Sequence, residues 1–525
     1  MSTQFAAPNT LQDKLQELYQ SLLPKVEPIH FQRLTERMAS AWNARPEALK
    51  SEDAADRDWY LSNQVVGLRL PAGLFAGDLE QSTAQIRYLK ELGITLVQIT
   101  AQPGVQESSM ESFRPLISAL RAAGIRVCLD LAIPRMDPEQ TWPLVIEGVA
   151  ERLLSIANLG VSIVNLDAIS ISSKDAGTKS SLGLPIHTLL KVLRLIVEIV
   201  CPSVILLGKS GDEPAETAKS FGGDTEPECQ LLFNVGQMVN LWNTLATRDA
   251  RLMAKCAKHG ARIPKQACWL HYARCQDEID WRLNDNVIQA LGFSPEAHKQ
   301  YLIHFYKGDH YLSYARGELF GFNPDALDAR NSGTLASLAG LEAAQDQHDL
   351  YQRELAIKRI LLIHAQLLAE AGVPMINSGD EIATLNNWHY KDDPDKASDS
   401  RWLHRPAFDW DRADRRTDRG TTEGIVFTAL QQLIAIRQQQ DILSPSIPAK
   451  MIECQERPIY SFVKFLGKEA FLFIGNYSED RQFVQSSVFH GMGLFGARTD
   501  LISGKTVQLN QERILLGPFE YLWLK

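Results

Sequence analysis

The sequence has no hydrophobic run long enough to cross a membrane as a helix. The longest apolar candidates, such as LLKVLRLIVEIV, fall short of the roughly 18 residues that such a helix needs, and charges interrupt them at helical spacing. The first residues, MSTQFAAPNT, lack a basic patch followed by an apolar stretch, so we expect no secretion signal. Neither a membrane protein nor a membrane partner is expected.

Cysteine is scarce and shows no pairing pattern. The seven cysteines are an odd number, are scattered along the chain and include no CxxC pair. Cys128 (RVCLDLA) and Cys201 (EIVCPSV) stand in apolar segments. These features argue against a disulfide framework and predict a reducing, cytoplasmic location.

Clustered positive charge is also missing. The formal net charge is −9, and no basic run is long enough to bind nucleic acid, which needs clustered Lys and Arg. The histidines show no paired metal-ligand spacing, so no metal is expected. Lys209 and Ser210 resemble the end of a phosphate-binding loop, but the required first glycine falls at Ser203. We therefore expect neither nucleic acid nor a cofactor.

What the sequence does contain is a repeated alternation of strands and helices. Hydrophobic residues make up 45% and charged residues 22% of the 525 residues, as in ordinary globular proteins. Helix-like stretches separate most of the strand candidates, and eight such units favour a closed (β/α)8 TIM barrel over an open sheet. The eight strand candidates are VVGLRL, ITLVQIT, IRVCLDLA, VSIVNLDA, SVILLGKS, CQLLFNV, ACWLHYA and VPMINSG.

Other patterns flank the barrel. Residues 1–58 carry apolar positions at helical spacing and predict a helical N-terminal domain. The barrel is predicted over 59–444, with a helical insertion at about 280–350 between its seventh and eighth strands. Residues 445–525 read as short strands with polar turns and predict a C-terminal β-sandwich.

Acidic and polar residues collect where the predicted barrel strands end, which is where barrel enzymes carry their functional groups. Facing carboxylates suit glycoside chemistry, because one attacks the anomeric carbon while a protonated one donates to the leaving oxygen. The strand-end residues are Asp130, Asn165, Asp167, Lys209, Ser210, Gly211, Asp212, Glu213, Gln276, Asp277, Glu278, Asp380 and Glu381.

Several strings, in the same order, resemble glycoside hydrolase family 13 (the α-amylase family), and within it the amylosucrases. The resemblance covers nearly the whole chain and implies the barrel, both flanking domains and the insertion. The matching strings include LFAGDLEQSTAQIRYLKELGITLVQI, LLFNVGQMVNLWNTLATRDARL, YARCQDEIDW, FNPDALDARNSGTLASLAGL, INSGDEIATLNNW and SDSRWLHRPAFDW.

The resemblance fails at the chemistry. It implies Asp167 as the catalytic nucleophile and Asp277 as the second retained carboxylate, but Gly211 stands where the family has its acid/base Glu. Asn165 replaces the family's Arg, and Gln276 replaces its His. The insertion expected after the third strand also looks deleted or much shortened.

The resemblance also assigns substrate-binding residues, through their positions in the matching strings alone. Asp130, Asn165, Gln276 and Arg401 occupy substrate-binding positions. The arginine at the position of Arg401 pairs with an acid of the second-strand loop in the family. Because that loop is short here, Arg401 is expected to have lost this partner and to be free for an anion or another surface. His404 and Arg405, in the same string, are expected to serve loop packing.

The sequence therefore predicts a catalytically impaired member of the family with a binding or regulatory role in sucrose or α-glucan metabolism, and with a carbohydrate-active enzyme as a possible partner. Two alternatives stay open. One is an active retaining α-glucosyl transferase or hydrolase that uses Asp167, with Asp212 or Glu213 as the acid. The other is a purely structural barrel whose mouth is filled by its own side chains.

Overall fold

The computed structural model describes residues 9–71, 79–100, 113–131, 142–166, 186–209, 217–258, 263–324 and 328–525. The chain divides into two compact units. The first comprises residues 1–90, 94–233 and 261–270, and the second comprises 91–93, 234–260 and 271–525. No helix within the described ranges is long and apolar enough to cross a membrane.

Eight parallel strands form a closed barrel in the order β1, β10, β7, β6, β5, β4, β3, β2, which confirms the predicted TIM barrel. Each contains part of one of the eight predicted runs. Strands buried on both faces read as continuous apolar runs, and this is why the sequence revealed them. The strands are β1 (Gly67–Pro71), β2 (Leu96–Thr100), β3 (Arg126–Asp130), β4 (Ile163–Asn165), β5 (Ile205–Gly208), β6 (Leu231–Phe233), β7 (Cys268–Tyr272) and β10 (Gly372–Asn377).

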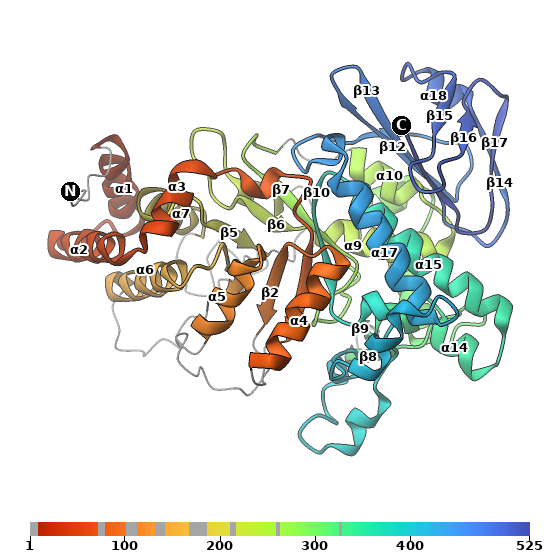
Figure 1. Ribbon diagram of the computed structural model, residues 1–525, viewed down its shortest axis with the longest axis horizontal. Coiled ribbons are helices and arrows are strands. Elements are labelled where there is room, and N and C mark those ends of the chain that lie inside the picture. Colours follow the sequence, from red (N-terminus) through yellow and green to blue (C-terminus); the bar gives the residue numbers. More distant parts are fainter. Residues whose placement is uncertain are drawn as a thin grey trace. The chain divides into compact units, whose positions relative to one another are not determined.

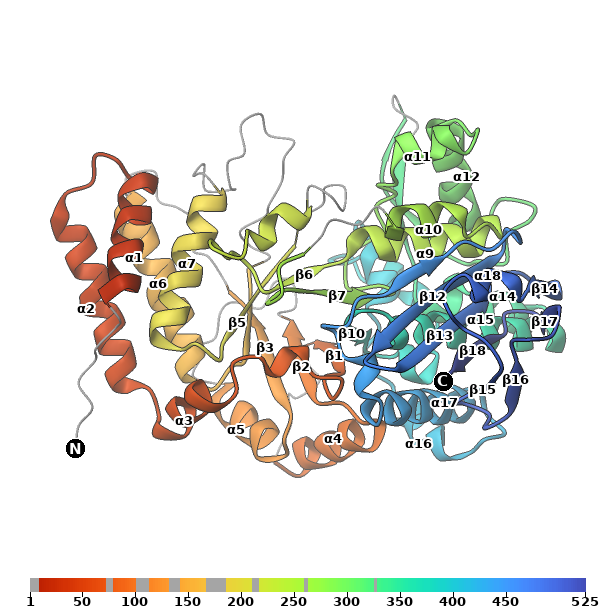
Figure 2. The ribbon, with the colours of Figure 1, turned by 90° about the horizontal axis from the view of Figure 1, so that it is seen from above.

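Helices of the first unit include the predicted helical N-terminal region. In Figure 2, α1 and α2 lie against α6 and α7. Leu15, Leu34 and Met38 are buried, as their helical spacing predicts. The helices are α1 (Asn9–Leu22), α2 (Pro28–Ala44), α3 (Glu47–Ala55), α4 (Leu79–Leu92), α5 (Arg114–Ala122), α6 (Trp142–Asn158) and α7 (Ile186–Val200).

Two connections after barrel strands are short. β2 ends at Thr100 and α5 begins at Arg114, while β3 ends at Asp130 and α6 begins at Trp142. Folded domains need about 50 residues or more. Residues 131–141, which alone join β3 to α6, have no room for one.

Helices dominate the second unit, including the predicted insertion after β7. In Figure 1, α15 and α17 lie side by side. The helices are α9 (Val235–Thr247), α10 (Arg251–Lys258), α11 (Asp285–Ala290), α12 (Pro295–Lys307), α13 (Leu335–Leu338), α14 (Leu341–Asp346), α15 (Leu350–Ala369), α16 (Trp410–Asp414) and α17 (Thr422–Gln438).

The insertion also contains an antiparallel hairpin that the sequence did not predict, formed by β8 (Glu318–Asn323) and β9 (Asp328–Ser332). Its register shifts between Phe320 and Asn323, and Gly321 between them has a φ of 60°. This irregularity breaks the two-residue alternation by which strands are recognised.

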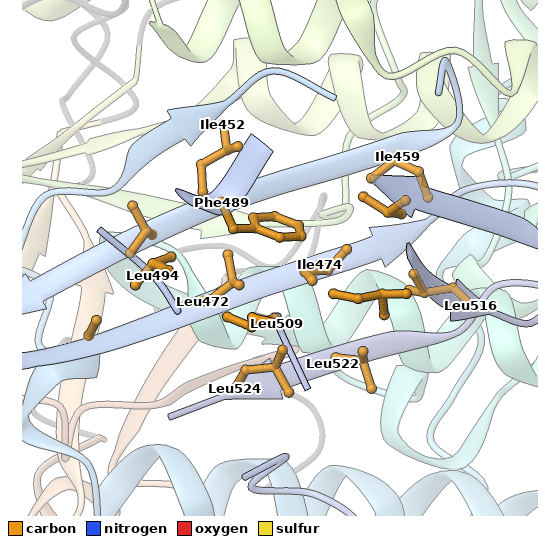
Figure 3. Close-up of a cluster of buried hydrophobic side chains, with 14 residues drawn as sticks. Ile452, Ile459, Leu472, Ile474, Phe489, Leu494, Leu509, Leu516, Leu522 and Leu524 are labelled. Carbon is orange, nitrogen blue, oxygen red and sulfur yellow. The ribbon is translucent and has the colours of Figure 1, made fainter. Parts of the chain in front are cut away.

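Antiparallel sheets form the C-terminal region, as predicted. Fourteen buried residues, among them Leu472, Ile474 and Phe489, gather in one hydrophobic cluster (Figure 3). One sheet has the order β11, β12, β13, β18, and two-stranded sheets pair β14 with β17 and β15 with β16. The elements are β11 (Lys450–Ile452), β12 (Ile459–Leu466), β13 (Glu469–Asn476), β14 (Gln482–Gln485), α18 (Ser487–His490), β15 (Ala497–Thr499), β16 (Thr506–Gln508), β17 (Arg513–Leu516) and β18 (Tyr521–Leu524).

A buried carboxyl group joins the barrel helices of the second unit to the C-terminal sheet. Glu370 Oε1 accepts hydrogen bonds from Gln237 Nε2 (2.7 Å), Gln366 Nε2 (2.7 Å) and Tyr460 OH (3.2 Å). Burial raises the pKa of Glu370 to about 7. His271 Nε2 donates to the Ala371 carbonyl, which leaves Nδ1 as an acceptor 3.5 Å from Glu370 Oε2. A proton on Glu370 Oε2 can be donated to His271 Nδ1, so the geometry favours the neutral form of Glu370.

We expect Glu370→Gln to remove a pH dependence of stability. Glu370 keeps its proton in the folded state up to about pH 7, whereas the unfolded chain loses it near 4.5, so the wild-type protein becomes less stable as pH rises between these values. Glutamine is neutral throughout and can donate to His271. Urea unfolding should show similar stabilities at pH 4.5 and an advantage for the variant of about 2–3 kcal/mol at pH 8. The exposed Glu469→Gln is the control, and a pH-independent difference between wild type and Glu370→Gln would contradict this expectation.

Candidate active site

Five of the predicted site residues lie in the described part of the chain. Asp130 and Asn165 belong to the first unit, and Gln276, Asp277 and Arg401 belong to the second. The predicted nucleophile and the acid/base position with its possible substitutes, Asp167, Gly211, Asp212 and Glu213, lie outside the described residues. Their roles stay predictions.

In the first unit, a chain of polar side chains crosses four neighbouring barrel strands. Arg69 Nε on β1 donates to Gln98 Oε1 on β2 (3.0 Å), and Gln98 Nε2 donates to Asp130 Oδ1 on β3 (3.3 Å). Asn165 Nδ2 on β4 donates to the same oxygen at 2.7 Å. Asp130 and Asn165 are also direct neighbours in the strand register. The Arg69 guanidinium lies 5.3 Å from the centre of the Phe233 ring on β6.

In this geometry the Asn165 side chain positions the Asp130 carboxyl group. This amide side chain is buried, and its Oδ1 has no hydrogen-bond partner among the described residues. An amide carries no charge and cannot stabilise an ionised neighbour as a cation would.

In the second unit, a buried ion pair fixes the backbone after β7. Arg274 Nε donates to Asp380 Oδ1 at 2.7 Å, and both side chains are 2% exposed. Asp380 begins the short 3₁₀ helix η5 (Asp380–Ile382) that follows β10. Burial raises the pKa of Asp380 to about 6, and the Arg274 guanidinium opposes that rise. The pair therefore ties the ends of β7 and β10 together.

His404 attaches the loop after β10 to the backbone segment that follows β7. It ends the 3₁₀ helix η7 (Ser400–His404). Its Nδ1 accepts from the Gly333 N–H (3.2 Å), so its Nε2 carries the proton and donates to the Gln276 carbonyl (3.1 Å). Burial lowers the pKa of His404 to about 3, so the ring is neutral. The prediction that His404 serves loop packing is confirmed.

Asp277 lies beside a thiol and a guanidinium. Arg405 Nη2 is 3.9 Å from Asp277 Oδ1, and Cys275 Sγ donates to Oδ2 at 3.7 Å. Arg405 Nε also donates to the Gln276 carbonyl (2.7 Å). Gln276 Oε1 has no hydrogen-bond partner within the described ranges. Asp277 and Arg405 thus bring a carboxylate and a cation together, a pair that suits the hydroxyl groups of a sugar.

Arg401 is not free for an anion or another surface, and that part of the expectation is wrong. Arg401 makes a bidentate pair with Asp399, through Nε (2.9 Å to Oδ1) and Nη2 (2.8 Å to Oδ2), and Nη1 lies 3.9 Å from Glu278 Oε2. Hydrogen bonds from Arg401 lower the pKa of Asp399. The guanidinium also lies over the Phe320 ring. Asp399, two residues away in the same loop, therefore holds Arg401, whereas the second-strand loop at 101–112 lies outside the described residues.

Sequence reasoning missed Arg69, Gln98 and Asp399 as members of these clusters, and it assigned Arg405 to loop packing without its place beside Asp277. Arg69 and Gln98 did leave a signal, because each interrupts an apolar barrel strand. A charged or amide side chain within such a strand needs a buried polar partner.

Known proteins resemble this chain in sequence, although only distantly. The sequence matches no known family profile. It is 22% identical over 444 residues to a glucosylglycerate phosphorylase of Spirochaeta thermophila, covering 81% of this chain and 71% of that protein. It is 21% identical over 396 residues to a glucosylglycerate phosphorylase of Escherichia coli, covering 74% and 65% of the two chains.

Solved structures resemble the protein over most of its length. AmyP in complex with maltose has a TM-score of 0.57 at 14% identity, covering 91% of this chain and 98% of that one. A trehalulose synthase mutant in complex with Tris has a TM-score of 0.58 at 14% identity, covering 89% and 100%. The α-amylase of Geobacillus thermoleovorans complexed with acarbose has a TM-score of 0.54 at 12% identity, covering 88% and 98%. The chain has the fold of the α-amylase family, and the predicted resemblance is confirmed at that level.

Proposed function

We propose that this protein is an amylosucrase-like member of carbohydrate metabolism that binds sucrose or an α-glucan but lacks the standard glucosyl-transfer activity. Asp167 and Asp277 are its retained carboxylates, and Gly211 stands at the position of the missing acid. Such a protein would regulate or assist a carbohydrate-active enzyme.

The observation that carries this proposal is the bond from Asn165 to Asp130 (2.7 Å). In the family, the residue two before the nucleophile is a cation that keeps the nucleophile ionised and oriented. Here that position is a neutral amide committed to Asp130. The replacement adds to the loss of the acid, because the site then lacks both a cation beside the nucleophile and a group that protonates the leaving oxygen.

The acid alone accounts for a large loss. General acid catalysis contributes about 10²–10⁴-fold, and a glucosyl leaving group needs it. Asp212 or Glu213 would have to reach in from other backbone positions, and a misplacement of about 1 Å can cost about 10²-fold. The missing acid at position 211 and the missing cation at position 165 both lower turnover, and neither loss prevents a sugar from binding.

The ligand-binding part of the proposal predicts that maltotriose or sucrose binds the protein in calorimetric titrations. Asp277→Asn should weaken that binding by about tenfold, because a sugar hydroxyl loses a charged acceptor. Asp395→Asn, in an exposed acidic loop, is the matched control and should change the affinity by less than twofold. Absence of binding for both sugars at millimolar concentrations would contradict a sugar-binding role.

A second candidate is an active glucosyl phosphorylase or transferase with Asp167 as nucleophile and Asp212 or Glu213 as acid. The names of the curated relatives favour it, together with the guanidinium of Arg405 beside Asp277, since phosphorolysis needs cations for its anionic acceptor. Phosphate consumption in the presence of glucosylglycerate, lost in Asp167→Asn, would support this candidate over the binding role.

A further inference from the structure

The second unit contains a cavity of about 400 Å³ that uses none of the candidate active-site residues. It lies among α9, α10, α11 and α12, which neighbour one another in Figure 2, and Arg457 completes it from the turn before β12. Small-molecule sites commonly measure about 300–1,000 Å³ and form where different parts of a fold meet. This cavity has room for a monosaccharide-sized ligand.

One wall is apolar and includes an exposed ring. Leu252, Ile288 and Leu291 line it, and Phe293, which is 44% exposed, stands among them. The Phe293 ring lies 5.9 Å from the ring of His298. A large aromatic side chain exposed at a cavity offers a flat surface to the apolar face of a ligand ring.

Other residues of the lining offer fixed hydrogen-bonding groups. His298 Nε2 lies 2.6 Å from Asn243 Oδ1, an acceptor, so the proton sits on Nε2 and Nδ1 is left to accept. Burial lowers the pKa of His298, which keeps the ring neutral near pH 7. A hydroxyl group in the cavity would therefore find an acceptor at His298 Nδ1.

The charged side chains that line the cavity form ion pairs, except for one arginine. Arg248 Nε donates to both carboxylate oxygens of Glu479 at 2.7 Å. Asp249 accepts from Arg251 Nε (2.9 Å) and Nη2 (2.6 Å). The exposed guanidinium of Arg457, by contrast, makes no hydrogen bond or ion pair with any residue that the structure describes. Only its backbone carbonyl is engaged, by the Ala250 N–H.

The backbone at Arg248 adds an independent observation. Arg248 ends α9 in the left-handed conformation, with φ 56° and ψ 33°, where glycine would be free of strain. Non-glycine residues held in this region collect at functional sites. Arg248 is itself a lining residue of the cavity, and its guanidinium is paired with Glu479.

We propose that this cavity binds a small organic anion of monosaccharide size, in which a sugar ring packs on Phe293, a hydroxyl group donates to His298 Nδ1, and a phosphate or carboxylate pairs with Arg457. Guanidinium groups recognise both kinds of anion. The site is separate from the carboxylates of the barrel, so it would serve an effector and not the glucosyl group that is transferred or bound there.

Calorimetric titration of the full chain with glucose 6-phosphate tests the proposal, with glucuronate, glucose and inorganic phosphate as comparison probes. At least one of the two sugar anions should bind at or below millimolar concentration and at least tenfold more tightly than glucose or phosphate. Which of the two binds identifies the anionic group. Arg457→Gln and Phe293→Ala should each weaken that binding by fivefold or more.

Matched controls exist in the same unit. Arg481→Gln and Phe483→Ala alter an exposed arginine and an aromatic side chain that is 52% exposed, both outside the cavity, and should change the affinity by less than twofold. Asp277→Asn should also leave it unchanged. Loss of binding in Asp277→Asn would assign the sugar anion to the barrel and overturn the proposal. So would equal binding of phosphate alone, or no binding of either sugar anion.

Discussion

Asp380→Ala is expected to lower the free energy of unfolding by about 3–5 kcal/mol, because it leaves the buried Arg274 guanidinium without its carboxylate. The two side chains are each 2% exposed and 2.7 Å apart. Urea unfolding at pH 7.5, where the Asp380 carboxyl with its pKa of about 6 is ionised, measures the effect.

Two further variants separate the buried charge from the loss of packing. Glu453→Ala breaks an exposed pair with Lys258, whose side chains are 62% and 57% exposed, and should cost less than about 1 kcal/mol. The double variant Arg274→Met, Asp380→Leu should recover most of the lost stability, because replacing both ions with apolar groups removes the uncompensated charge. If the double variant were less stable than Asp380→Ala, the explanation by an unpaired ion would be wrong.

Gly211→Glu alone is expected to leave sucrose turnover less than tenfold above the wild-type background, although it restores the residue type of the missing acid. A well-placed general acid would add about 10²–10⁴-fold. The variant lacks the cation at position 165, where Asn165 is bonded to Asp130, and it lacks the inserted domain for which residues 131–141 leave no room. Fructose release from sucrose measures the outcome.

Gly211→Gln is the matched control, since it has nearly the same size and no acidic proton. High fructose release in Gly211→Glu and none in Gly211→Gln would mean that the acid was the only missing part. The proposed impairment by several losses would then be wrong.

The barrel could be predicted from the sequence because its strands are buried on both faces. β5, in which every residue is buried, reads as an unbroken apolar run, ILLG. The β8–β9 hairpin escaped prediction because its register shifts and its strand ELFGFN contains Gly321 in a left-handed conformation. Short strands such as β15 and β16 carry too few residues for any periodicity to be recognised.

For the candidate site, the sequence showed which family residues are replaced by another type, but it did not show what the replacing side chains contact. That Asn165 replaces a cation followed from its position, whereas its bond to Asp130 depends on the alignment of β3 with β4. Arg401 shows a different failure: only a distant family partner was considered, and the nearby Asp399 was overlooked. Side-chain partners depend on backbone geometry that composition and spacing do not determine.

Fructose release from sucrose, measured for the purified protein beside Asp167→Asn, tests the central claim most directly. We expect no release above background from either protein, because the acid at position 211 and the cation at position 165 are both missing. Release by the wild type that disappears in Asp167→Asn would contradict this expectation and establish an active glucosyl-transfer site.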